Sequence, residues 1–255
     1  MLDIRNVVKN IKTLPYETLN EYTPYTLTGL KSYWSRKTYN KNVYVYLSDN
    51  KFVEGRKSLY FAIGGYKPGG FDFRIHKRQL INAYFTSMQD SSNQTRDSTY
   101  EKIIMTKGSP WLWLTDDLTG CTVMIVEYDD NSYGMIHLRP NHLELTSYQK
   151  YFKYRSWKFK LDELAELKEK NIALEKEALK IVQSKSLGSR IRRYILVQSE
   201  IAHSALKQLN IVGVYRDGNW RFFIHAISAM LGEYEFREIC WRNYPTFTSL
   251  RSEYK

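Results

Sequence analysis

Three turn-forming residues, Asp129-Asp130-Asn131, stand between two apolar runs, and this arrangement constrains the fold more than any other segment of the chain. The first run covers residues 121–128 and the second covers 132–138. Asp and Asn favour tight turns because their side chains hydrogen-bond to the nearby backbone and tolerate left-handed conformations. The sequence therefore predicts that the two runs form an antiparallel hairpin.

The predicted hairpin carries both halves of a candidate catalytic pair, Cys121 and His137. Successive residues of a strand face opposite sides of a sheet, so the pairing register decides whether these two side chains can meet. They face the same side only if odd residue numbers pair with odd ones, or if a bulge corrects the register.

Other segments show strand or helix patterns. Short apolar runs predict strands at 42–47, 58–63 and 111–114. Apolar residues at helical spacing predict helices at 4–14, 74–88, 161–183, 190–209 and 220–231, whereas 15–41 looks irregular. The fold class we expect is α/β (α+β), with a mixed or antiparallel β-sheet core, flanking helices and a C-terminal helical hairpin made by 161–183 and 190–209.

These patterns divide the chain of 255 residues into three segments. We expect a catalytic domain at 1–160, the helical hairpin at 161–210, and a C-terminal segment of strand, turn and helix at 211–255. The net charge of +11 is uneven, since 111–137 contains no lysine or arginine. A basic body therefore frames an acidic segment that holds the candidate pair, and such a body would attract an acidic partner or an anionic membrane face.

The composition argues against several classes of protein. Two cysteines in a chain this long indicate a reducing compartment rather than a disulfide framework. The sequence lacks paired Cys/His spacings for zinc and glycine-rich phosphate loops, so we expect neither a metal nor a cofactor. No apolar stretch approaches the roughly 20 residues that span a bilayer, and the first residues lack the order of a secretory signal.

Cys121 follows Gly120 at the front of its apolar run, where a thiolate could attack an amide carbonyl. The pKa of a free thiol is about 8.5, so a neighbouring imidazole must take its proton at neutral pH. Main-chain N–H groups at the Gly120–Cys121 step could stabilise the oxyanion, because glycine leaves the approach open. Asp116 and Asp117 would disfavour the thiolate if they pointed inward, so we expect them to point outward, or one of them to support His137.

This interpretation needs a thiol that solvent and reagents can reach. A cysteine that begins a strand is more often a small buried hydrophobe, and a lone histidine on a strand is more often a hydrogen-bonded structural residue. The second cysteine, Cys240, stands in a segment with a helical pattern, and we expect it to pack in a core.

The pattern Leu118-Thr119-Gly120-Cys121-Thr122 resembles the Leu-(Ser/Thr)-Gly-Cys-Thr motif of the cytotoxic necrotizing factor toxins and of Burkholderia lethal factor, which are glutamine deamidases. The following stretch, through Gly134-Met135 and His137, is similar to the chemoreceptor glutamine deamidases. The resemblance covers residues 115–140. It implies that Cys121 attacks the carboxamide of a protein glutamine, that His137 donates a proton to the leaving ammonia, and that the main chain of Thr115 holds the histidine.

The same resemblance implies a partner and a location. The partner would be a protein with a reactive glutamine, such as a host small GTPase or a translation factor. The protein would be a bacterial toxin or effector, secreted or injected, that acts in the host cytoplasm. With an amine in place of water, the same thioester intermediate would give transglutamination.

A second segment, from Asp217-Gly218-Asn219 through Ala226-Ile227-Ser228, looks like the nucleophile segment of OTU-type deubiquitinases. Trp220 stands where that family has its cysteine, so thiol chemistry is not possible there. We interpret the segment as a turn followed by an amphipathic helix, with His225 as a structural residue.

Three other functions stay open. The charge of +11 and the 21 tyrosines would suit a nucleic-acid binder, although no recognition motif is present. A basic interaction module could bind an acidic protein through its helices while Cys121 is inert. A cysteine protease or acyltransferase could use the same Cys121–His137 pair.

Overall fold

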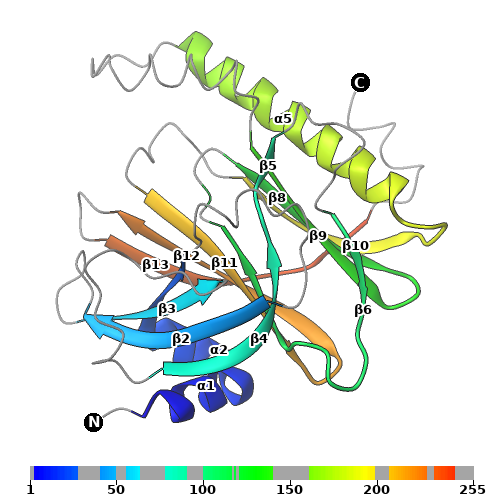
Figure 1. The fold of residues 1–255 in the computed structure, drawn as a ribbon. Coiled ribbons are helices and arrows are strands. Elements are labelled where there is room, and N and C mark those ends of the chain that lie inside the picture. Colours follow the sequence, from blue (N-terminus) through cyan, green and yellow to red (C-terminus); the bar gives the residue numbers. More distant parts are fainter. Residues whose placement is uncertain are drawn as a thin grey trace.

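The computed structural model describes residues 3–27, 41–49, 56–63, 78–90, 100–116, 118, 121–139, 161–198, 207–228 and 233–244. Two mixed β-sheets pack face to face, and helices cover the outer face of each sheet (Figure 1). The mixed sheet core and the flanking helices confirm the coarse fold class that the sequence predicts.

The larger sheet has eight strands in the described part of the chain, and it combines early and late segments of the sequence. Its β1–β3 and β4–β7 pairs are parallel and the others are antiparallel. Across the sheet the order is β1 (Tyr22–Leu27), β3 (Lys57–Ile63), β2 (Lys41–Asp49), β4 (Arg78–Thr86), β7 (Leu112–Thr115), β11 (Lys207–Arg216), β12 (Asn219–Ser228) and β13 (Glu233–Ile239).

The smaller sheet is built around the predicted hairpin. Its order is β14 (Arg242–Asn243), β10 (Ile191–Gln198), β8 (Thr122–Tyr128), β9 (Ser132–Arg139) and β5 (Gln89–Asp90), and β6 (Lys102–Ile104) also pairs with β9. The β8–β9 hairpin is confirmed, and Asn131 takes the left-handed conformation with φ 58° that its turn requires.

Three apolar clusters hold the layers together. The first lies under α1 (Ile4–Thr13) and α2 (Pro15–Glu21), where Val7, Ile11 and Leu19 are buried against the larger sheet. The second, here called the inter-sheet core, fills the space between the two sheets. The third lies under α5 (Leu161–Ser184), whose apolar residues pack on β8 and β9.

The helices predicted at 4–14 and 161–183 are confirmed, but the other three predicted helices are wrong. The segments 74–88, 190–209 and 220–231 contain β4, β10 with the start of β11, and β12. These strands are buried on both faces, so apolar residues point to both sides of the sheet. The alternation of apolar and polar residues that identifies a strand is therefore missing from the sequence. On β12, Trp220, Phe222 and Ile224 face the inter-sheet core while Phe223 faces the helices.

The helical hairpin is therefore absent from the described residues, and α5 packs on the smaller sheet instead of on a second helix. The irregular structure expected at 15–41 is also wrong where it is described, because α2 and β1 lie there. The three-segment division stays a prediction, and strands on either side of its boundaries pair with one another, as β8 does with β10 and β7 with β11.

A polar network fastens the turn of the β8–β9 hairpin. The Asp130 carboxylate accepts hydrogen bonds from Lys102 Nζ at 2.6 Å, from Ser189 Oγ at 2.8 Å and from Ser132 Oγ at 2.5 Å. These hydrogen bonds hold the pKa of Asp130 below its usual range, against the opposing effect of burial. The network links the hairpin to β6 and to the segment that joins α5 to β10.

None of the helices that the structure describes is long and apolar enough to cross a lipid bilayer.

Candidate functional site

The candidate pair lies where two neighbouring segments of the chain pass from the larger sheet to the smaller one. Strands β4 and β7 are parallel neighbours that end together at Thr86 and Thr115. After Thr86 the chain continues through Met88 into β5, and after Thr115 it continues into β8. Because β5 and β8 flank β9, both crossings end beside the strand that carries His137.

The register brings Cys121 and His137 to the same face of the smaller sheet. Val123 pairs directly with His137, so odd residues pair with odd ones and no bulge is needed. Cys121 precedes Val123 by two residues and therefore faces the same side, as its place in the inter-sheet core confirms. Cys121 and His137 are thus diagonal neighbours across the hairpin, at a spacing that long or aromatic side chains can bridge.

Met88 borders the same position from the other side of β9. Gln89 pairs with Leu138 in parallel, so Met88 stands level with His137 on the adjoining strand. The Sγ atom of Cys121 donates to the Sδ atom of Met88 at 3.4 Å. The register therefore places the imidazole between the strand of the thiol and the strand of the thioether.

Both members of the pair are buried. Cys121 exposes 2% of its surface and His137 exposes none. This burial differs from the accessible thiol that the nucleophile interpretation needs.

The first of the two alternatives expected for Asp116 is wrong, and the second, that one of Asp116 and Asp117 supports His137, stays a prediction. Asp116 does not point outward, because it is buried and its carboxylate accepts a hydrogen bond from the main-chain N–H of Met88 at 3.1 Å. The hydrogen bond ties the two crossing segments together. Asp117 lies outside the described residues.

Thr115 and Gly120 complete the predicted set. Thr115 ends β7 and is fully buried, and its Oγ1 has no hydrogen-bond partner within the part of the chain that is described. Gly120 lies outside the described residues, so the predicted oxyanion step is not described. The expectation for Cys240 is wrong, because it follows a strand rather than lying on a helix, and it is exposed.

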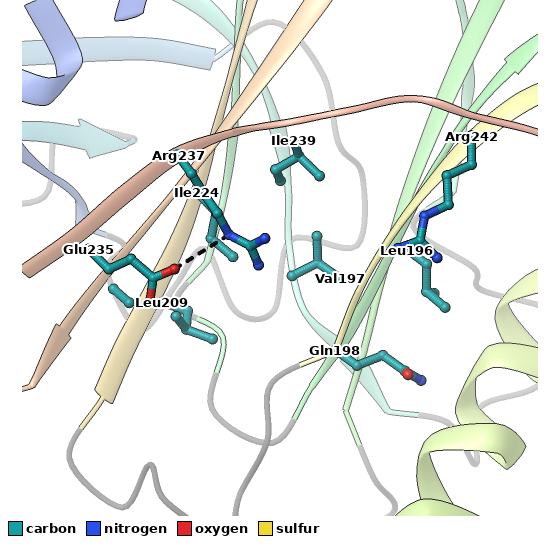
Figure 2. Close-up of a pocket in the computed structure, with 10 residues that line it drawn as sticks. Leu196, Val197, Gln198, Leu209, Ile224, Glu235, Arg237, Ile239 and Arg242 are labelled. Atoms are coloured by element: carbon teal, nitrogen blue, oxygen red, sulfur yellow. Dashed lines mark ion pairs between the residues drawn. The ribbon is translucent and has the colours of Figure 1, made fainter.

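A pocket of about 240 Å³ opens at the side of the inter-sheet core, and neither Cys121 nor His137 lines it. Figure 2 shows the residues that do. The pocket lies between β10, β11, β12, β13 and β14. Its polar lining includes Arg237, which forms an ion pair with Glu235 at 3.5 Å, and also Gln198 and Arg242. Its apolar lining includes Val197, Leu209, Ile224 and Ile239.

Sequence reasoning did not find Met88 or the pocket. Met88 stood at the end of a segment wrongly predicted to be a helix, and its neighbours come from strands far away in the chain. The sequence did not identify the two arginines of the pocket as binding residues either, because they stand in a segment with no recognisable motif. The alternation of charged and apolar residues from Glu233 to Arg237 could have indicated an edge strand there.

The deubiquitinase-like segment, 217–228, forms the turn of the β11–β12 hairpin and the strand β12. Asp217 and Gly218 form its two-residue turn with φ values of 52° and 80°, which confirms the predicted turn. Trp220 follows on the strand and is buried in the inter-sheet core.

The chain matches no known protein family, and no curated protein matches its sequence significantly.

Proposed function

We propose that this protein is a cysteine-dependent glutamine deamidase that acts on a protein substrate, with Cys121 as the nucleophile and His137 as the general acid and base. The observation that carries the proposal is the register of the β8–β9 hairpin. It places a thiol and an imidazole as diagonal neighbours on one face, at the point where two chain crossings meet.

The reaction proceeds in two halves. His137 takes the thiol proton, Cys121 Sγ bonds to the carboxamide carbon, and the imidazolium returns the proton to the departing ammonia. Water then attacks the thioester as His137 accepts one of its protons, and the proton passes to the sulfur as the thiol leaves. The substrate glutamine becomes glutamate, and an amine in place of water would give transglutamination.

The remaining parts of the proposal come from the local sequence pattern. Main-chain N–H groups at the Gly120–Cys121 step would hold the oxyanion, and each well-placed donor is worth about 3 kcal/mol of barrier. The main chain of Thr115 would orient the histidine. By the same resemblance, the substrate is a host protein such as a small GTPase or a translation factor, and the protein is a delivered toxin or effector.

The burial of Cys121 favours a second candidate function, a non-enzymatic interaction module. In that case Cys121 and Met88 are ordinary members of the inter-sheet core, and the basic surface binds an acidic partner. The two candidates differ in a simple property, because only the enzyme needs a thiol that a small electrophile can reach in the native protein.

A proteomic experiment tests the enzyme. Host-cell extract is incubated with the wild-type protein, and mass spectrometry searches for amide-to-acid shifts at glutamines. We expect shifts on one or a few proteins, and we expect Cys121→Ser and His137→Ala to abolish them. Cys240→Ser is the matched control, since it removes the exposed cysteine, and it should leave the shifts unchanged.

Native alkylation separates the two candidates. In the Cys240→Ser background Cys121 is the sole thiol, and iodoacetamide should label it while the protein stays folded. Labelling only after denaturation would favour the interaction module. Cleaved peptides in place of acid products would show that the pair serves a protease instead.

A further inference from the structure

The pocket lies between two strand edges, those of β13 and β10, that no other described strand covers along their whole length. In the part of the chain that is described, β13 ends the larger sheet. On the smaller sheet, β14 pairs with β10 only at Arg193 and Tyr194, which leaves the last residues of β10 unpaired on that side within the described strands. Figure 2 shows the Arg237–Glu235 pair on one side of the pocket and Arg242 on the other, with Val197 and Ile239 between them.

Two residues of the pocket wall adjoin the segment that holds Cys121. Val197 pairs directly with Val123, so it is a diagonal neighbour of Cys121 on the inward face. The carbonyl oxygen of Leu209 accepts a hydrogen bond from the N–H of Leu118 at 2.8 Å, three residues before the cysteine. Cys121 does not line the pocket, but Val197 lines it and belongs with Cys121 to the inter-sheet core, and Leu209 lines it and packs against that core.

The size and the charge of the pocket limit what it can hold. Pockets for drug-sized ligands measure about 300–1,000 Å³, so a volume of about 240 Å³ suits one side chain. Its lining carries two guanidinium groups, on Arg237 and Arg242, against the single carboxylate of Glu235. Both ion-pair partners, Arg237 and Glu235, are more than half exposed, so an incoming anion can compete for the arginine.

The two strand edges favour an extended chain as the occupant. Among the described residues, no strand pairs with the outer edge of β13 or with the end of β10, and their main-chain N–H and C=O groups are of the kind that an added strand can pair with. An extended segment that lies along this opening would place alternate side chains into the pocket.

Building on the proposed deamidation, we propose that this pocket receives the glutamine side chain of an extended, acidic segment of the substrate protein, and that Val197 and Leu209 move aside to admit its carboxamide to Cys121.

The first arm of the test measures access to the thiol and needs no substrate. The full-length protein carrying Cys240→Ser is alkylated with anionic iodoacetate or neutral iodoacetamide, and mass spectrometry gives the rate at Cys121. N-acetylcysteine in the same solution supplies the intrinsic ratio of the two reagents. We expect Cys121 to favour iodoacetate by about tenfold over that ratio at low salt, the lower end of the effect of a charged cleft.

Two variants show whether the arginines cause this preference. The double variant Arg237→Gln/Arg242→Gln should return the ratio to that of N-acetylcysteine. Arg5→Gln is the matched control, since Arg5 is an exposed arginine on α1, and it should leave the ratio unchanged. The preference should also shrink as salt rises, because the screening length falls to about 10 Å at 0.1 M.

The second arm tests the substrate class with two short peptides. One has a glutamine flanked by Asp and Glu, and the other has a glutamine flanked by Lys and Arg. The acidic peptide should slow the alkylation of Cys121 by iodoacetamide several-fold, and the basic peptide should not. Loss of this protection in Arg237→Gln/Arg242→Gln supports the pocket as the binding site, and equal protection by both peptides overturns the acidic specificity.

The outcomes separate this inference from the proposed function. If glutamines in extract are converted to glutamate but the alkylation ratio is the same with and without the two arginines, the protein is a deamidase and the substrate does not reach Cys121 through the pocket. If the alkylation ratio falls in the double arginine variant but no glutamine is converted in extract, the pocket leads to Cys121 and the proposed deamidase activity is wrong. No alkylation of Cys121 in the native protein would overturn both.

Discussion

Two β-hairpins of this fold each carry a buried histidine, and their surroundings differ. In the β8–β9 hairpin, His137 stands opposite the apolar Val123 and faces the inter-sheet core beside a thiol. In the β11–β12 hairpin, His225 stands opposite Asn210 and faces the helix side of the larger sheet. Its ring lies 6.1 Å from that of Tyr25 and 6.3 Å from that of Tyr234.

The two histidines are both buried, so they differ in their neighbours and not in their exposure. Burial, with a smaller contribution from the positive charge of Arg56, lowers the pKa of His225 to about 3. Neither ring nitrogen of His225 has a hydrogen-bond partner among the described residues. His225 therefore stays neutral and has no thiol to activate, whereas the neighbour of His137 is the one buried cysteine that the structure describes.

The largest expected contrast between the two histidines is in activity. In the proposed mechanism His137→Ala removes the general acid and base, and we expect the rate of glutamine conversion to fall by about 100-fold or more. His225→Leu should leave the rate unchanged, because His225 lies on the opposite face of the larger sheet from the inter-sheet core. Conversion is measured by mass spectrometry on the substrate found in extract, and equal losses in both variants would contradict the assignment.

The second contrast is in the dependence of stability on pH. The folded pKa of His225 is about 3, and that of an unfolded histidine is about 6.5. As the pH falls below about 6.5, the unfolded chain binds a proton that the folded protein does not, so the free energy of unfolding falls. The stabilising contribution is present above that pH and is lost progressively towards pH 3.

We expect a loss of about 2 to 3 kcal/mol from this group between about pH 7.5 and about pH 4.5. Denaturant unfolding at several pH values measures it, with His225→Leu as the comparison. Leucine has a similar size and does not titrate, and replacing an unpaired buried polar group by an apolar one can be neutral or stabilising. Parallel pH curves for the two proteins would show that His225 does not carry the effect.

Each hairpin also has a glycine that is covered by an aromatic ring. A Cβ atom at Gly134 would overlap the ring of Tyr100, and a Cβ atom at Gly213 would lie 2.5 Å from Cε1 of Phe222. Both rings are buried, so neither can move away freely. We expect Gly134→Ala and Gly213→Ala each to lower the free energy of unfolding by about 1 to 3 kcal/mol.

A double-mutant cycle separates the two glycines. Tyr100→Leu should relieve the cost of Gly134→Ala, because it removes the ring that the new methyl group meets, and should leave the cost of Gly213→Ala unchanged. Denaturant midpoints of the single and double variants supply the coupling. Equal coupling of Tyr100 to both glycines would mean that the two hairpins do not pack independently.

The same two hairpins show what could be read from the sequence. Both turns could be predicted, because Asp129-Asp130-Asn131 and Asp217-Gly218 act locally on the backbone. The strand after the second turn was wrongly predicted to be a helix, because its apolar residues face two cores. Phe223 packs under the helices, whereas Trp220, Phe222 and Ile224 pack in the inter-sheet core. A strand buried on both faces has no alternation that reveals its period.

The site could be predicted only as far as the hairpin reaches. Cys121 and His137 belong to adjacent strands, so local spacing was enough to propose them together. Met88, Leu209 and Arg237 approach the same place through the pairing of distant strands. No local pattern encodes these pairings, and the burial of Asp116 against the N–H of Met88 follows from the same long-range contact.

The smallest expected effect concerns the sulfur contact beside His137. Met88→Leu keeps the volume of the side chain, and it keeps the main-chain N–H that donates a hydrogen bond to Asp116. The free energy of unfolding should therefore change by less than about 1.5 kcal/mol. Asp116→Ala is the matched comparison, because it leaves that partly buried N–H without its acceptor and should cost about 1 to 3 kcal/mol. Denaturant unfolding and the rate of alkylation of Cys121 are measured on both. If Met88→Leu removes activity while Asp116→Ala keeps it, the thioether rather than the crossing of the two segments positions the thiol, and the comparison between the two histidines must then include the sulfur of Met88.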